Sequence, residues 1–149
     1  MKKSLILLLV LGVASTASAI TTDWKSVAQG RVSSNWLNAA NWSNGLPINV
    51  SANSATLYKS AAQTDGPIIN GEATARIIRC GGTGGPLGTT AHLTMQSGTL
   101  TVGESLFVAP DSITGGGKNG MLHMWGGTIN LAGMLGIGTG TSSLSSLMI

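Results

Sequence analysis

Two tryptophans and the asparagines beside them are the residues whose types and spacing could do chemistry. Trp36 and Trp42 lie six positions apart in SNWLNAANWSNG, and in an extended segment an even separation places two side chains on one face. Two indoles on one face can stack on sugar rings, and Asn35 and Asn41 can offer amides to sugar hydroxyl groups. The interpretation that we favour is that these tryptophans cover the apolar end of a stacked fold.

Trp125 is a third candidate contact for a cell-surface or matrix polysaccharide, because the strand pattern described below gives it an outward position. The sequence does not indicate metal chemistry. Its two histidines and its one cysteine, Cys80, do not have the spacing of a zinc site, and its glycine-rich segments lack the Asp of calcium-binding repeats. We therefore expect no metal site and no cofactor, and a Cys80 that is buried as a small apolar residue.

The carboxylates do not form a pattern that predicts catalysis. The chain has five acidic residues, scattered through predicted turns and the N-terminal region, whereas glycoside hydrolysis requires two carboxylates on either side of one bond. A polysaccharide lyase on a parallel β-helix is a remote alternative, because the fold by itself does not confer that activity. We predict that the chain is not an enzyme and has no catalytic residues.

Residues 1–19 have the layout of a secretory signal peptide. Lys2 and Lys3 precede an apolar run over residues 5–13, and ASA at residues 17–19 predicts cleavage after Ala19. The apolar run is shorter than the roughly 20 residues of a membrane span. We therefore expect a secreted or cell-surface protein whose mature chain does not span the membrane. Removing Lys2 and Lys3 leaves six basic residues against five acidic ones, which gives no basic surface for nucleic acid.

A repeat of 29 residues predicts the architecture. Residues 91–111 align without a gap with residues 120–140, and both copies hold three pairs of apolar residues at a spacing of two. Such a spacing places both members of a pair on one face of a strand, and glycine-containing turns separate the pairs. The aligned pairs are Leu93/Met95 with Leu122/Met124, Leu100/Val102 with Ile129/Leu131, and Leu106/Val108 with Leu135/Ile137.

Three short strands in each unit and no helix predict an all-β fold, a parallel β-helix (β-solenoid) with an N-terminal Trp-rich cap. Its coils would stack about 4.8 Å apart. An antiparallel β-sandwich of short strands is the alternative. We expect a signal peptide over residues 1–19, a cap region over residues 20–72 and solenoid coils over residues 73–149, with an irregular first coil whose faces are ambiguous around Ile77 and Ile78. TSSLSSLMI begins a further coil without a cap, so we expect an incomplete solenoid, a fragment of a longer protein, that can self-associate at its uncapped end.

The cap region resembles that of a known group of exported proteins. Trp24, NW at residues 35–36, NWSNGLP at residues 41–47 and SATL at residues 54–57 are similar to the Trp…NW..G..P motif of secreted bacterial β-solenoid surface proteins. Such proteins occur among planctomycete, verrucomicrobial and lentisphaeral bacteria, and their layout is similar to that of autotransporter passengers and of exported proteins with a sorting tail. Unlike them, the chain has no acidic residue over residues 48–55.

This resemblance implies an exported structural protein of the cell surface, without catalytic activity, that forms the N-terminal part of a larger passenger or stalk. The alternative function is a secreted carbohydrate-binding module that uses exposed tryptophans.

Overall fold

The structure is a computed structural model. Residues 1–19, which hold the predicted signal peptide and cleavage site, lie outside the residues that the structure describes. Among the residues that are described, no helix is long and apolar enough to cross a membrane. The described residues are 20–49, 54–57, 66–81, 90–109, 119–138 and, for the backbone alone, 145–148.

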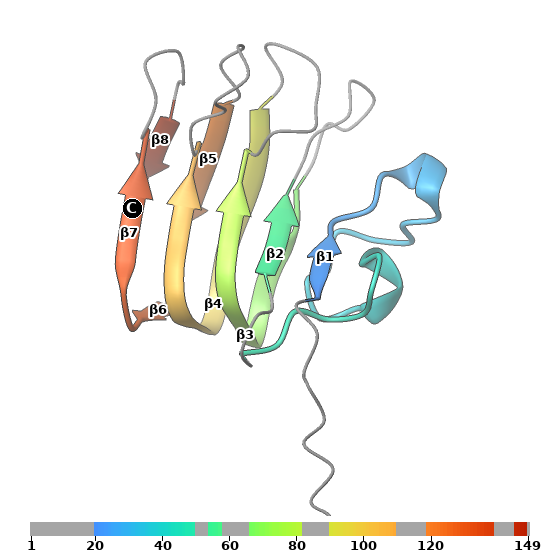
Figure 1. The fold of residues 1–149 in the computed structure, drawn as a ribbon, viewed down its shortest axis with the longest axis horizontal. Helices are drawn as coiled ribbons and strands as arrows, with labels where there is room; N and C mark the ends of the chain where they lie inside the picture. The colour runs from blue at the N-terminus through green and yellow to red at the C-terminus, as the bar shows by residue number, and fades with distance from the viewer. Residues whose placement is uncertain are drawn as a thin grey trace, which may run out of the picture.

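Strands dominate the described chain, and every pairing between them is parallel (Figure 1). The strands follow the order β1-β2-β3-β4-β5-β8, and β6 and β7 also pair with β4. This arrangement confirms the β-solenoid and excludes the antiparallel β-sandwich. In chain order the elements are β1 (Thr21–Asp23), the 3-10 helices η1 (Val27–Gln29) and η2 (Ala39–Asn41), β2 (Ser54–Leu57), β3 (Ile68–Cys80), β4 (Thr90–Val108), β5 (Asn119–Met124), β6 (Thr128–Leu131), β7 (Met134–Ile137) and β8 (Ser145–Met148).

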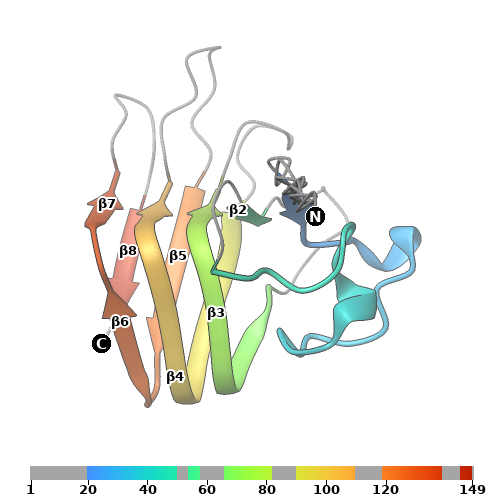
Figure 2. The same ribbon diagram turned by 60° about the horizontal axis from the view of Figure 1, so that its bottom comes forward.

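Strand β4 runs through a whole coil and sets the register of the next one. Its first part pairs with β5, its middle with β6 and its last part with β7, and the chain turns back on itself between the first and last parts (Figure 2). Leu93 pairs with Leu122, Leu100 with Ile129 and Leu106 with Leu135, and each of these partners lies 29 positions further along the chain. The register predicted from the repeat is therefore confirmed.

Strand β3 forms the coil on the other side of β4 and has a less regular register. Ile68 pairs with Thr94, 26 positions on, whereas Cys80 pairs with Val108, 28 positions on, because the register shifts at two places along β3. These shifts hide the repeat in the sequence. Ile78 is the buried member of the ambiguous pair.

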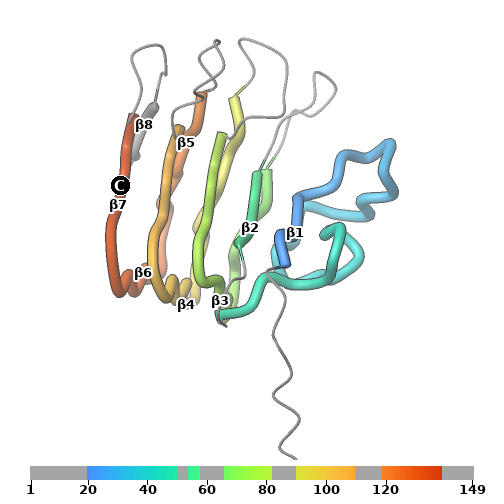
Figure 3. The backbone as a smooth tube through the Cα atoms, viewed as in Figure 1, coloured from blue at the N-terminus to red at the C-terminus, as the bar shows by residue number. Residues whose placement is uncertain are grey.

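The sheet extends further toward the N-terminus than the expected start of the coils at Ala73. β3 begins at Ile68, β2 pairs with the last part of β3, and β1 pairs with β2. At the opposite end, β8 pairs with β5, so residues 145–148 lie as the first strand of a further coil. Figure 3 shows the described coils side by side, with the N-terminal cap region next to β2 and β3.

Inward side chains of successive coils stack into ladders that form the core. The middle coil is covered on both sides, and its inward residues Leu93, Met95, Leu100, Val102 and Val108 are fully buried. In the last coil β5 is covered by β4 and β8, whereas β6 and β7 pair with β4 alone among the described strands, so Leu135 and Ile137 remain 44 % and 39 % exposed. The main ladders are Ile69–Met95–Met124, Ala73–Leu100–Ile129, Ala75–Val102–Leu131, Ile78–Leu106–Leu135 and Cys80–Val108–Ile137.

Glycine is required where consecutive coils turn a corner together. Gly98 and Gly127 have φ values of +80° and +89°, a region that favours glycine. Gly98 pairs with Gly71 of the preceding coil, and a Cβ atom added to Gly98 would collide with the Gly71 carbonyl group. The predicted use of glycine at the corners is thus confirmed.

Candidate functional site

The tryptophans of the N-terminal region form one packed cluster, the tryptophan lid (Trp24, Trp36 and Trp42). All three are at most 3 % exposed and belong to the hydrophobic core. The Trp42 ring lies 5.0 Å from the Trp24 ring and 4.7 Å from the Trp36 ring, centroid to centroid, with interplanar angles of 73° and 72°. Such edge-to-face contacts add to the free energy gained from burying aromatic area.

Backbone hydrogen bonds attach the tryptophan lid to the first coils. The Trp36 amide donates to the Ile68 carbonyl oxygen at 3.0 Å, and the Trp24 amide donates to the Thr56 carbonyl oxygen at 3.0 Å. Trp24 also forms an antiparallel bridge with Trp42, whose indole Nε1 donates to the Trp36 carbonyl oxygen at 2.9 Å. The predicted role of these residues as a cap is therefore confirmed.

Asn41 holds the chain in the shape that brings the tryptophans together. Its side-chain oxygen accepts hydrogen bonds from the amides of Val32 and Ser33, at 3.0 and 3.2 Å. Its side-chain nitrogen donates to the carbonyl oxygen of Asn35 at 2.8 Å. Because Asn41 is fully buried and its amide is engaged at both ends, its role is to brace this loop.

The expectation that Trp36 and Trp42 share an open face does not hold. The segment between them is not extended, because it contains η2, and the two rings meet at 72° inside the core. Trp36, Trp42 and Asn41 are closed to solvent, so the exposed members of the predicted carbohydrate-contact set are Asn35 and Trp125. The Trp125 side chain is 77 % exposed, on the outward position that the repeat predicts.

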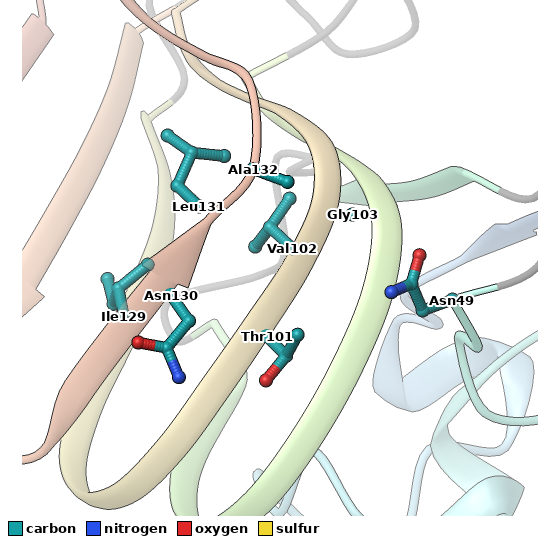
Figure 4. A pocket seen from close by; sticks show the side chains of 8 residues that line it. All are labelled: Asn49, Thr101, Val102, Gly103, Ile129, Asn130, Leu131 and Ala132. Carbon is teal, nitrogen blue, oxygen red and sulfur yellow. The ribbon is translucent and has the colours of Figure 1, made fainter.

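A concave site of about 520 Å³ lies where β4 and β6 pass the segment that precedes β2 (Figure 4). Its polar groups are the amides of Asn49 and Asn130 and the hydroxyl of Thr101. Gly103 allows Asn49 to approach, because a Cβ atom at Gly103 would collide with the Asn49 side-chain oxygen. The residues lining this site, here called the Asn49 pocket, are Asn49, Thr101, Val102, Gly103, Ile129, Asn130, Leu131 and Ala132.

The Asn49 pocket combines uncharged hydrogen-bonding groups with an apolar wall. Among its lining residues there is no carboxylate, imidazole, thiol or amine that could act as an acid, a base or a nucleophile. Amides and hydroxyl groups beside apolar side chains suit an uncharged polyhydroxylated ligand. Sequence reasoning missed this pocket because Asn49 and Asn130 are far apart in the chain and belong to no motif.

Within the described part of the chain, His, Cys, Asp and Glu side chains do not gather in any group of three or more that could hold a metal ion. Cys80 is fully buried, and its thiol donates to the carbonyl oxygen of Ala91 at 3.4 Å. Burial raises the pKa of the Cys80 thiol to about 12, only partly opposed by a hydrogen bond to Met121, so this cysteine is an inert core residue.

Two ionisable contacts on the described surface were not predicted. Arg76 and Glu104, on adjacent coils, form an ion pair at 2.6 Å. The rings of His92 and His123 lie 5.8 Å apart, centroid to centroid, although these histidines do not occupy equivalent positions in the repeat.

Comparisons of the chain with protein-family models, with curated proteins and with solved structures find no match.

Proposed function

We propose that this chain is an exported structural protein, a non-catalytic β-solenoid segment of a bacterial cell-surface or matrix stalk. The observation that carries the proposal is the continuous ladder of inward side chains from β3 to β7, closed at its N-terminal end by the tryptophan lid. In such a stack each coil contacts only its neighbours, and successive coils extend the structure in one direction. A rod of this kind transmits force and spans distance.

The layout of residues 1–19 supports the exported location, and the resemblance of the Trp…NW..G..P motif supports the surface role. The lid is consistent with both, because a solenoid that extends in one direction needs one sealed end. Sealing also blocks head-to-tail growth at the N-terminal side, where Trp24 and Trp42 cover the core.

Export and rigidity can be tested together. We expect expression in a bacterial host to give a product that begins at Ile20 in the periplasm or medium, and a purified chain that resists proteinase K for hours. Trp42→Ala should be digested much faster because it opens the lid, whereas Val27→Ala, at an exposed position, should resist as the wild type does. A chain that stays uncleaved in the cytoplasm, or one digested as fast as its Trp42→Ala variant, contradicts the proposal.

The proposed lack of catalysis has its own assay. Incubating the purified chain with a panel of uronate polymers should release no unsaturated uronate, measured as absorbance near 235 nm. Release of such products by the wild type would establish the lyase alternative instead.

A second candidate function, carbohydrate binding, is favoured by the Asn49 pocket and by exposed Trp125. Stacking on an indole and hydrogen bonds from Asn130 and Thr101 are the interactions that a neutral glycan uses. In this interpretation the stalk would also adhere to a cell-surface or matrix polysaccharide.

Retention on insoluble glycans tests this second function. If the wild-type chain is retained on a glycan, Trp125→Ala and Asn130→Ala should each be retained less. Both variants should keep the circular dichroism spectrum of the wild type. Gln96→Ala and Thr74→Ala are the matched controls, because Gln96 precedes Trp125 by 29 positions and Thr74 is an exposed strand residue one coil before Thr101. Equal retention of all four variants would remove the pocket and Trp125 as binding sites.

A further inference from the structure

The outer face of the pair β4–β5 gathers two histidines and a methionine. Leu93 and Leu122 are buried on the inner face, so the residues on either side of them in these strands face outward. Those residues include His92 in β4 and Met121 and His123 in β5. His92 and Met121 are direct partners in the register, and His123 follows Met121 on the same face.

The two imidazoles are already in contact. Their ring centroids lie 5.8 Å apart with an interplanar angle of 81°. The Nε2 atom of His123 is buried and has no hydrogen-bond partner. Buried polar atoms without a partner are rare in native proteins, and each one requires an explanation such as a bound ion.

The chemistry of the possible ligand atoms limits which metal ions this patch could bind. Met121 and His92 are register partners on neighbouring strands, about one strand spacing of 4.8 Å apart, and His123 lies two residues beyond Met121. One thioether and two imidazoles therefore share one patch of the outer face. Calcium and magnesium select oxygen ligands, and structural zinc sites use four ligands that are thiolates, imidazoles or carboxylates. A thioether is a soft ligand and an imidazole is a borderline one, and one thioether beside two imidazoles favours monovalent copper.

We propose that His92, Met121 and His123 form a three-coordinate binding site for monovalent copper on the outer face of the solenoid. The site joins two consecutive coils, and a bound ion would stabilise the folded chain by an amount that rises with the logarithm of its affinity. The sequence does not reveal the site because its two histidines are diagonal neighbours, displaced by two positions from the 29-residue register. The proposal does not depend on the structural or the carbohydrate-binding role.

An anaerobic titration tests this site directly. The mature chain, in a Cys80→Ala background that removes the only thiol, competes with bicinchoninate for copper supplied under ascorbate. We expect one equivalent to bind, and expect His92→Gln and His123→Gln each to weaken binding at least tenfold. Met121→Leu should weaken binding of monovalent copper while leaving any binding of Zn²⁺ unchanged. Met134→Leu, at an exposed methionine in β7, is the matched control and should bind as its parent does.

Each contrary result overturns the proposal. Failure of the parent chain to compete would show that the imidazole contact is packing alone, and wild-type affinity in Met121→Leu would show that the methionine is not a ligand. If a histidine variant fails to fold, judged by circular dichroism, the parent chain labelled with ¹³C at methionine methyl groups decides. The Met121 methyl signal should shift on addition of one equivalent of copper and the Met134 signal should not; an unmoved Met121 signal refutes the site.

Discussion

Adding one methyl group at a corner of the solenoid should reveal how tightly its coils stack. Gly98 has φ +80° and lies directly over Gly71 of the preceding coil. Gly30 has a similar φ of +87°, but a Cβ atom there would have no neighbour within 4 Å. Gly98→Ala and Gly30→Ala therefore impose the same backbone conformation on alanine, and only the first also places an atom between two coils.

The backbone cost is common to both variants. Alanine in the left-handed region costs about 1–2 kcal/mol, of which roughly 0.4–1 kcal/mol is offset because the alanine chain loses less entropy on folding. Gly30→Ala should thus destabilise the fold by about 1 kcal/mol. The collision of the Gly98→Ala methyl with the Gly71 carbonyl group adds an overpacking cost of about 1–3 kcal/mol.

Urea unfolding, followed by circular dichroism on the mature chain, measures the difference. With an m-value of about 1–3 kcal/mol per molar urea, the midpoint of Gly98→Ala should lie roughly 1 M below that of Gly30→Ala. Equal midpoints would refute the reasoning, because they would mean that Gly98 does not lie against Gly71 of the preceding coil.

Three further predictions follow from burial and charge. In the same urea assay, Leu106→Ala should lower the free energy of unfolding by about 2–5 kcal/mol. Leu135 lies at the equivalent position one coil later and is 44 % exposed, so Leu135→Ala should lower it by less than half as much. Burial raises the pKa of the Cys80 thiol from 9.0 to about 12. The folded state is therefore fully stabilised by the neutral thiol below pH 9. As the pH rises toward 12, the free energy of unfolding falls by about 1.4 kcal/mol per pH unit. Cys80→Ala should lack this alkaline loss in stability measured against pH; a parallel decline in both proteins would contradict it. Burial also raises the pKa of the Asp23 carboxyl above 3.8, and a hydrogen bond to Thr56 opposes this shift in part. The folded state is therefore stabilised by the protonated carboxyl below pH 3.8. It loses this stability as the pH rises through the folded-state pKa. Asp23→Asn should therefore raise the melting temperature more at pH 7 than at pH 3, and an equal shift at both pH values would show that the carboxylate is not penalised.

Coil stacking could be read from the sequence because it depends on local patterns. A spacing of two fixes the face of each side chain, and equal spacing in successive coils fixes which residues meet. Leu93 therefore meets Leu122, and Leu106 meets Leu135, as the alignment requires. In β3, where the register shifts, the same reasoning could not assign the partners of Ile68 or Cys80.

Contacts between non-equivalent positions could not be predicted, because they depend on the path of the chain between strands. The tryptophan lid was expected as a cap, but the turn at η2 that rotates Trp42 against Trp36 carries no periodic signal. Asn49 reaches Gly103 through a segment with no repeat, and His92 meets His123 across a diagonal. Comparing aligned positions alone overlooks such diagonal pairs.

Interstrand nuclear Overhauser contacts in the mature chain test the stacked parallel solenoid most directly. Backbone contacts should link β4 residues to residues 29 positions further on, for example Thr101 to the neighbourhood of Asn130 and Leu93 to that of Leu122. The pattern should be that of evenly spaced parallel pairing. Short contacts between α-protons of facing residues are the mark of antiparallel pairing. Such contacts, or backbone contacts that define a β4–β5 register with an offset other than 29, would contradict the solenoid and the stalk function proposed from it.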